Sequence, residues 1–132
     1  MEVKGFLYKM AKEPKFFSFQ TQYFKRYFIL DAKQRCLFIQ NDEPPAKSVL
    51  NMPFRHLMYI DMVRNNEKSG EHPKCPWKYQ FRLETEDRKY LLFSRNEEEQ
   101  FLWLTAFYRI AKVEVTDMSY QPSLDILKIY DH

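Results

Sequence analysis

The feature that most constrains the fold of this 132-residue chain is a series of seven short segments in which side chains alternate between two faces. Alternation with a period of two is typical of β-strands. Prolines and polar turn residues separate the segments, and no helical pattern comes between them. Consecutive short strands without intervening helices favour an antiparallel sandwich or barrel. We expect these strands at residues 3–10, 22–30, 35–40, 47–52, 57–63, 77–84 and 88–93.

The composition also favours a sheet and argues against nucleotide chemistry. The chain has 12 Phe, 9 Tyr and 2 Trp, and aromatic residues favour strands and bury large areas. Only two glycines occur, Gly5 and Gly70, whereas phosphate-binding loops need several clustered glycines. The histidines, cysteines and acidic residues show no catalytic or metal-ligand spacing. We therefore expect a protein that is not an enzyme, with no catalytic residues, no metal and no cofactor.

One helix is predicted after the last strand. Ser94-Arg95-Asn96-Glu97 forms a capping-box pattern, and the glutamates that follow suit the positive end of a helix dipole. Two apolar stripes follow at helical spacing. We expect the first to face the core and the second to be covered by the C-terminal tail, with an oligomer contact as the alternative. The first stripe is Trp103, Ala106, Phe107 and Ile110, the second is Phe101, Leu104 and Tyr108, and the tail residues are Leu124, Ile126, Leu127 and Ile129.

Charge is distributed unevenly along the chain. The formal net charge is +3, and the first 35 residues alone carry an excess of basic residues. The last 39 residues carry an excess of acidic ones. This polarity suggests one basic face that can steer the protein towards an anionic surface, a membrane or a nucleic acid.

Four segments resemble the pleckstrin homology (PH) domain family, in the family's order and spacing. Gly5-Phe6-Leu7-Tyr8-Lys9 is similar to its opening Gly-x-Leu-x-Lys, and residues 24–30 resemble its second strand. Residues 47–52 loosely match the fourth strand, and residues 97–107 match the helix with its nearly invariant Trp, here Trp103. The resemblance covers about residues 3–111. It implies a seven-stranded antiparallel sandwich or barrel capped by one C-terminal helix at residues 1–113. The second stripe of the helix predicts that residues 114–132 form an extension that packs on it.

The PH resemblance implies a binding module whose ligands are often anionic lipid head groups, held at the open end of the barrel between the first two strands. Lys9 and Arg26 share the parity of the inward faces of these strands, so both are expected at that end. Arg offers a fork of donors and Lys a point charge, a combination that suits phosphate. Lys25 has the opposite parity and is expected to face solvent. The predicted head-group site is completed by Lys12 and Lys15 in the loop and by Lys47 at the matched position of the fourth strand.

The loop between the first two strands also carries three rings, Phe16, Phe17 and Phe19, among lysines. Exposed rings beside basic residues suit a membrane interface, so we expect these rings to insert into the bilayer. The alternative is that they extend the second strand and fold back onto the core.

The predicted lipid is phosphatidic acid or a phosphoinositide. The phosphoinositide-binding pattern of PH domains has a basic residue two positions before the Arg of the second strand, where this chain has Phe24. This departure favours a smaller head group such as phosphatidic acid. A looser resemblance, to the acylated PH-domain proteins of apicomplexan parasites that sense phosphatidic acid, implies the same ligand.

These features predict a peripheral module on the cytosolic face of a membrane, with an anionic phospholipid membrane as its partner and no nucleic acid. Two isolated cysteines, Cys36 and Cys75, fit a reduced intracellular protein, and no apolar run reaches the roughly 20 residues of a membrane span. The main alternative is a protein-interaction module on the same fold, which adds a peptide strand to an open sheet edge beside the helix.

Overall fold

The computed structural model describes residues 1–11, 21–63 and 72–115. All seven predicted strands are present, and the predicted helix follows them. An eighth strand of two residues, which the sequence did not predict, follows the helix. The elements are β1 (Glu2–Met10), β2 (Tyr23–Asp31), β3 (Cys36–Gln40), β4 (Ser48–Pro53), a 3₁₀ turn η1 (Phe54–His56), β5 (Leu57–Met62), β6 (Tyr79–Thr85), β7 (Lys89–Ser94), α1 (Glu97–Arg109) and β8 (Glu114–Val115).

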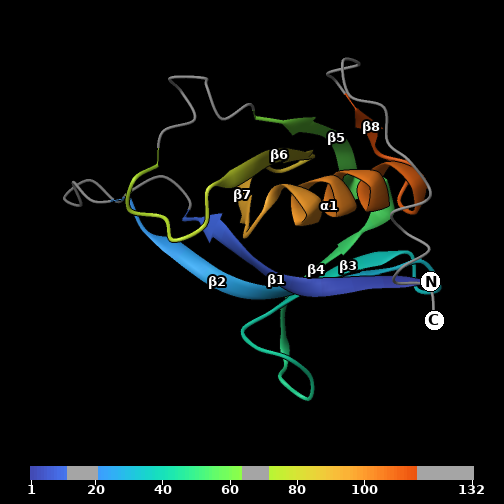
Figure 1. Ribbon diagram of the computed structural model, residues 1–132. Coiled ribbons are helices and arrows are strands. Elements are labelled where there is room, and N and C mark those ends of the chain that lie inside the picture. Colours follow the sequence, from blue (N-terminus) through green and yellow to red (C-terminus); the bar gives the residue numbers. More distant parts are fainter. Residues whose placement is uncertain (12–20, 64–71, 116–132) are drawn as a thin grey trace.

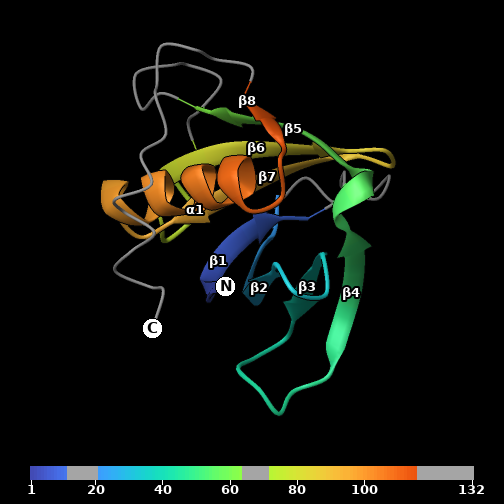
Figure 2. The same cartoon turned by 90° about the vertical axis from the view of Figure 1, so that its right-hand side faces the viewer.

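The strands form one sheet in the order β4-β3-β2-β1-β7-β6-β5-β8. Neighbouring strands are antiparallel except β5 and β8, which run parallel. Figures 1 and 2 show β1–β4 on one side of the molecule and β5–β8 on the other. The helix α1 contacts β5, β6 and β7. The predicted mainly-β fold with one C-terminal helix is therefore confirmed.

The core lies between the inner face of the sheet and the first stripe of α1. Trp103 is 2% exposed, and its ring lies 6.2 Å from the ring of Phe28 on β2 and 6.2 Å from that of Phe107. A Cβ atom built on Gly5 of β1 would lie 3.8 Å from Trp103 Cζ2, so a longer side chain at this position would have to displace the indole. Gly5 therefore gives Trp103 room against β1.

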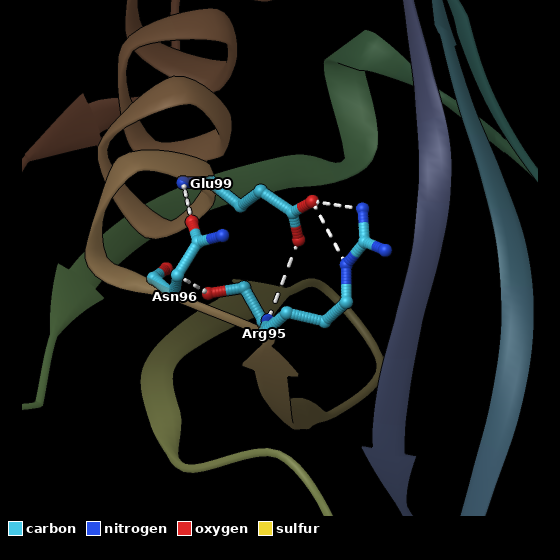
Figure 3. Close-up of polar contacts among 4 residues, drawn as sticks. Arg95, Asn96 and Glu99 are labelled. Atoms are coloured by element: carbon cyan, nitrogen blue, oxygen red, sulfur yellow. Dashed lines mark hydrogen bonds and ion pairs between the residues drawn. The ribbon is translucent and has the colours of Figure 1, made fainter.

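The helix begins two residues later than its sequence pattern predicted. The N-cap is Asn96, whose side-chain oxygen accepts a hydrogen bond from the Glu99 backbone N–H at 2.8 Å (Figure 3). Ser94 was the predicted cap, but it is the last residue of β7, and its hydroxyl donates to the Tyr79 carbonyl at 3.1 Å. Glu99 also binds Arg95, with the Arg95 Nε 3.0 Å from Glu99 Oε1. The capping-box prediction was thus right in kind and wrong in register.

The second stripe of α1 is only partly covered by described residues. Leu104 is fully buried, whereas Tyr108 remains 36% exposed. The start of the predicted extension forms β8, which pairs with β5 through Glu114 beside Tyr59 and Val115 beside Ile60. The tail residues Leu124, Ile126, Leu127 and Ile129 lie outside the described residues, so their packing on the helix stays a prediction.

Candidate functional site

The pairing of β1 with β2 places the two cations predicted for the head-group site on the same face of the hairpin. Lys9 pairs with Phe24, and Arg26 pairs with Leu7, so the two cations are diagonal neighbours. Both alternate in step with the fully buried Leu7 and Phe28. Because side chains alternate along a strand, Lys9 and Arg26 share the inner face near the β1–β2 loop, as their parity predicted.

The structure adds a third cation that sequence reasoning missed. Arg88 ends the turn between β6 and β7, and its guanidinium carbon lies 4.2 Å from the centroid of the Tyr90 ring. The Lys9 ammonium lies 5.9 Å from the same centroid. Thr85 fixes this turn, because its hydroxyl donates to the Arg88 carbonyl at 3.0 Å and accepts from the Arg88 N–H at 3.2 Å. Arg26 is close enough to Lys9 to act on its charge. We call Lys9, Arg26 and Arg88 the basic mouth.

The basic mouth concentrates positive charge at a partly buried position. Burial, Arg88 and Arg26, in that order of size, lower the pKa of the Lys9 ammonium. In the described parts of the chain, no ion pair engages any of the three cations. Burial raises the pKa of Tyr90, Arg88 opposes this effect, and the carboxylate of Asp87 adds to it. The mouth can therefore bind an anion, which would relieve the repulsion among its cations.

The guanidinium of Arg26 is held from two sides. It donates to the backbone carbonyl of Lys25 at 3.0 Å, and its carbon lies 5.0 Å from the ring centroid of Phe24. Stacking and one hydrogen bond leave most of the five N–H donors of the guanidinium for a ligand. Phe24, which stands where the phosphoinositide-binding pattern has a cation, thus supports Arg26 in this chain.

The other predicted site residues are placed as follows. Lys47 is exposed and immediately precedes β4. Its neighbour Ser48 pairs with Gln40 of β3, and Gln40 pairs with Tyr27 of β2. Lys47 is therefore two strands from Arg26, or about 10 Å at the usual strand spacing. Lys25 is exposed on the outer face, as predicted. The remaining predicted residues, Lys12, Lys15, Phe16, Phe17 and Phe19, lie outside the described residues.

The described ranges also bear on metal binding and on membrane spanning. There, no group of three or more His, Cys, Asp or Glu side chains is assembled that could hold a metal ion. None of the helices in the same ranges is long and apolar enough to cross a bilayer. Cys36 on β3 and Cys75 before β6 are both free.

A bent antiparallel sheet, a single C-terminal helix with a buried Trp, and cations at the β1–β2 end define a domain of the PH fold class. A family model matches residues 2–113, so the chain belongs to the family described as meiotic cell cortex C-terminal pleckstrin homology. PH domains are generally binding modules for lipids or proteins. The family match leaves the looser resemblance to the apicomplexan proteins untested.

Solved structures agree with this assignment. The C-terminal PH domain of human pleckstrin superposes with a TM-score of 0.63 at 18% identity, covering 90% of this chain and 85% of that one. The PH domain of human pleckstrin homology domain-containing protein family A member 5 has a TM-score of 0.58 at 22% identity, with 90% and 83% covered. The C-terminal PH domain of pleckstrin in complex with D-myo-Ins(1,2,3,4,5)P5 has a TM-score of 0.56 at 17% identity, with 82% and 95% covered. At these identities the likeness shows the fold alone. No curated protein sequence matches the chain.

Proposed function

We propose that this domain is a non-enzymatic, peripheral membrane-targeting module that binds an anionic lipid head group in the basic mouth. Lys9, Arg26 and Arg88 hold the phosphate, and Lys12, Lys15 and Lys47 extend the positive field around it. Phe16, Phe17 and Phe19 insert into the bilayer interface beside them. The observation that carries the proposal is that Lys9 and Arg88 share the Tyr90 ring, with Arg26 acting electrostatically on Lys9, and that none of the three has a described ion pair.

The head group of this proposal carries at least one phosphate that protrudes from the bilayer. Phosphatidic acid fits three cations, since its single phosphomonoester needs few donors. A phosphoinositide is the second possibility, and the inositol pentakisphosphate complex of the pleckstrin PH domain supports it by analogy of fold. The sequence pattern around Phe24 favours the smaller head group.

Co-sedimentation with vesicles of phosphatidylcholine tests this function. The vesicles contain phosphatidic acid, phosphatidylserine or a bisphosphorylated phosphoinositide at matched total charge. We expect selective pelleting with one of the two lipids that carry a phosphomonoester, phosphatidic acid or the phosphoinositide, over phosphatidylserine. The Lys9→Ala/Arg26→Ala variant should bind about 30-fold more weakly, because each cation near an anionic surface contributes about 1 kcal/mol.

The matched control is Lys4→Ala/Lys33→Ala, which removes the same charge from exposed positions towards the other end of the β1–β2 hairpin. It should lose only a few-fold in affinity, as expected for long-range attraction. Equal losses in both double variants would mean that the basic mouth attracts the membrane only through its charge and holds no head group. No pelleting of the wild type at low salt would refute the proposal.

The alternative of a protein-interaction module meets an obstacle at one of its expected surfaces. Strand addition beside the helix needs an open edge on β5, and β8 already pairs with that edge at Tyr59 and Ile60. A peptide would have to displace β8 there. This observation makes head-group binding the function that we favour.

A further inference from the structure

A groove of about 600 Å³ lies on the outer face of β3 and β4, where these strands meet the β2–β3 turn and η1. Its cations are Arg35 at the end of the turn and Arg55 in η1. Phe38 of β3 and Asn51 of β4, which pair with each other, line its other end, and Pro53 lies between. None of the described residues that line the groove is acidic. We call it the turn groove.

One backbone hydrogen bond brings the two arginines together. The Phe54 N–H donates to the Arg35 carbonyl at 3.0 Å, which continues the pairing of β3 with β4 by one residue and places Arg55 next to the turn. The nearby carboxylate of Asp31 is used by the turn itself. It accepts from two backbone N–H groups at 2.9 and 3.0 Å and from the Gln34 side chain at 3.0 Å. The positive charge of the arginines therefore stays available.

Arg35 has a backbone conformation that arginine rarely adopts. Its φ is 53°, in the left-handed region where glycine fits without strain and a residue with a Cβ atom does not. Strained backbone of this kind is frequent at functional sites, because the side chain that causes the strain is needed there. An arginine at a position that favours glycine suggests that its guanidinium has a use.

The polar groups of the turn groove are free for a ligand. Among the described residues, no ion pair or ring contact engages Arg35 or Arg55. Asn51 Oδ1 accepts from the Ser48 hydroxyl, which leaves the side-chain N–H groups of Asn51 as donors. Phe38 lies three residues beyond Arg35, or about 10 Å along the strand. The groove thus offers cationic donors at one end and a ring beside an amide at the other.

The turn groove is remote from the basic mouth. Arg26 lies near the start of β2, whereas Arg35 follows its end, and Arg26 and Asp31 alone are about 17 Å apart along the strand. Figure 1 shows the start of β2 on the left and the N-terminus, which pairs with its end, on the right. A domain whose mouth faces a bilayer therefore presents the turn groove away from that bilayer.

We propose that the turn groove binds an extended acidic peptide of a protein partner. Arginine clusters are a recurring means of recognising acidic motifs, and each guanidinium can hold a carboxylate through two parallel hydrogen bonds. In this arrangement Arg35 and Arg55 hold the carboxylates, and an apolar side chain of the peptide packs on Phe38. Because β4 is the last strand of the described sheet, the groove is open on that side to a longer chain.

The proposal adds a protein partner to the membrane function proposed above, and only the choice of a peptide over a bilayer rests on that function. Charge complementarity selects an acidic partner, since the lining carries two arginines and no described acidic residue. The β5 edge, which β8 occupies, takes no part in this binding.

NMR titration of the intact chain with a capped peptide, Ser-Glu-Glu-Ser-Leu-Ser, tests the proposal. We expect saturable shifts that are largest at Arg35, Phe38 and Arg55. A control peptide with glutamine in place of both glutamates should bind about 10-fold more weakly or less, because it lacks the charge-assisted hydrogen bonds. The absence of saturable shifts in the groove would overturn the proposal. Concentration-dependent shifts of the same residues without peptide would identify a second copy of the chain as the occupant and would also overturn it.

Arg35→Gly separates peptide binding from stability. Glycine relieves the left-handed backbone, so this variant should unfold at a higher temperature than the wild type while binding the acidic peptide about 10-fold more weakly. The matched control is Lys33→Ala, which removes a cation of the same turn that does not line the groove. It should bind the peptide within about two-fold of the wild type, since salt screens its charge. Wild-type peptide affinity in Arg35→Gly would contradict the proposal.

Vesicle pelleting distinguishes the turn groove from the basic mouth. Arg35→Gly/Arg55→Ala should pellet with vesicles of phosphatidylcholine and phosphatidic acid as the wild type does. Lys9→Ala/Arg26→Ala should keep the peptide affinity of the wild type. If the groove variant lost vesicle binding as strongly as the mouth variant, the groove would face the membrane and the peptide proposal would fall. Peptide binding without any vesicle binding would refute the head-group site alone.

Discussion

Lys9 is the clearest case of a single residue whose surroundings favour the binding of an anion. Its ammonium is half-buried and lies among other cations. Its pKa is lowered by burial first, then by Arg88 and Arg26. In the folded protein Lys9 therefore binds its proton less tightly than it does in the unfolded chain. This cost of charge is present below the folded pKa and disappears as pH rises towards the ordinary value, so the stability of the protein should rise across that window.

We predict that Arg88→Ala raises the pKa of Lys9, because it removes the larger of the two sources of repulsion. Binding of short-chain phosphatidic acid to the wild type should raise that pKa as well. NMR titration of the Lys9 side chain measures both changes. Lys89→Ala, which removes the neighbouring exposed charge of β7, is the control and should leave the pKa nearly unchanged. A Lys9 pKa that is insensitive to Arg88→Ala would mean that the two side chains do not share a site.

At this scale the sequence predicted part of the mouth. Strand parity alone put Lys9 and Arg26 on the same face, because alternation is a local property of β1 and β2. Arg88 could not be predicted in the same way. Its place beside Lys9 depends on the pairing of β1 with β7, in which Lys9 lies opposite Leu92, and nothing local in the sequence fixes that register. The residues of the β1–β2 loop stay predictions.

Among the elements, the start of α1 illustrates how two good capping residues compete. Ser94 and Asn96 are both frequent N-caps, and the sequence pattern selected Ser94. In the structure β7 extends through Ser94, whose hydroxyl donates to the Tyr79 carbonyl. Asn96 is therefore the N-cap, and its side chain accepts from the Glu99 N–H. The neighbouring β8 was also missed, since two residues become a strand only by meeting the free edge of β5.

The cap makes a specific prediction for stability. Asn96→Ala removes the acceptor for the Glu99 N–H and should lower the free energy of unfolding by about 1 kcal/mol. Asn96→Asp keeps an acceptor at the same place and should retain most of the wild-type stability. Urea denaturation followed by circular dichroism measures both variants. If Asn96→Ala were as stable as the wild type, the hydrogen bond of Figure 3 would contribute nothing to the helix.

For the whole molecule, the fold depends on how the two halves of the sheet close over α1, and Gly5 lies at one such contact. Gly5→Ala adds a Cβ at ordinary contact distance from Trp103 and should be as stable as the wild type. Gly5→Leu should lose about 1–3 kcal/mol, because the added carbons must displace the indole. Thermal unfolding of the two variants makes the comparison. Equal stability of Gly5→Leu would show that β1 and α1 can move apart freely.

The most direct test of the account is an NMR titration of the intact chain with soluble head groups. The ligands are short-chain phosphatidic acid and a soluble inositol bisphosphate. The account predicts saturable shifts that are largest at Lys9, Arg26 and Arg88 and that disappear in Lys9→Ala/Arg26→Ala. Saturable shifts confined to the β5–β8 edge, or no shifts with either ligand, would contradict a head-group site in the basic mouth.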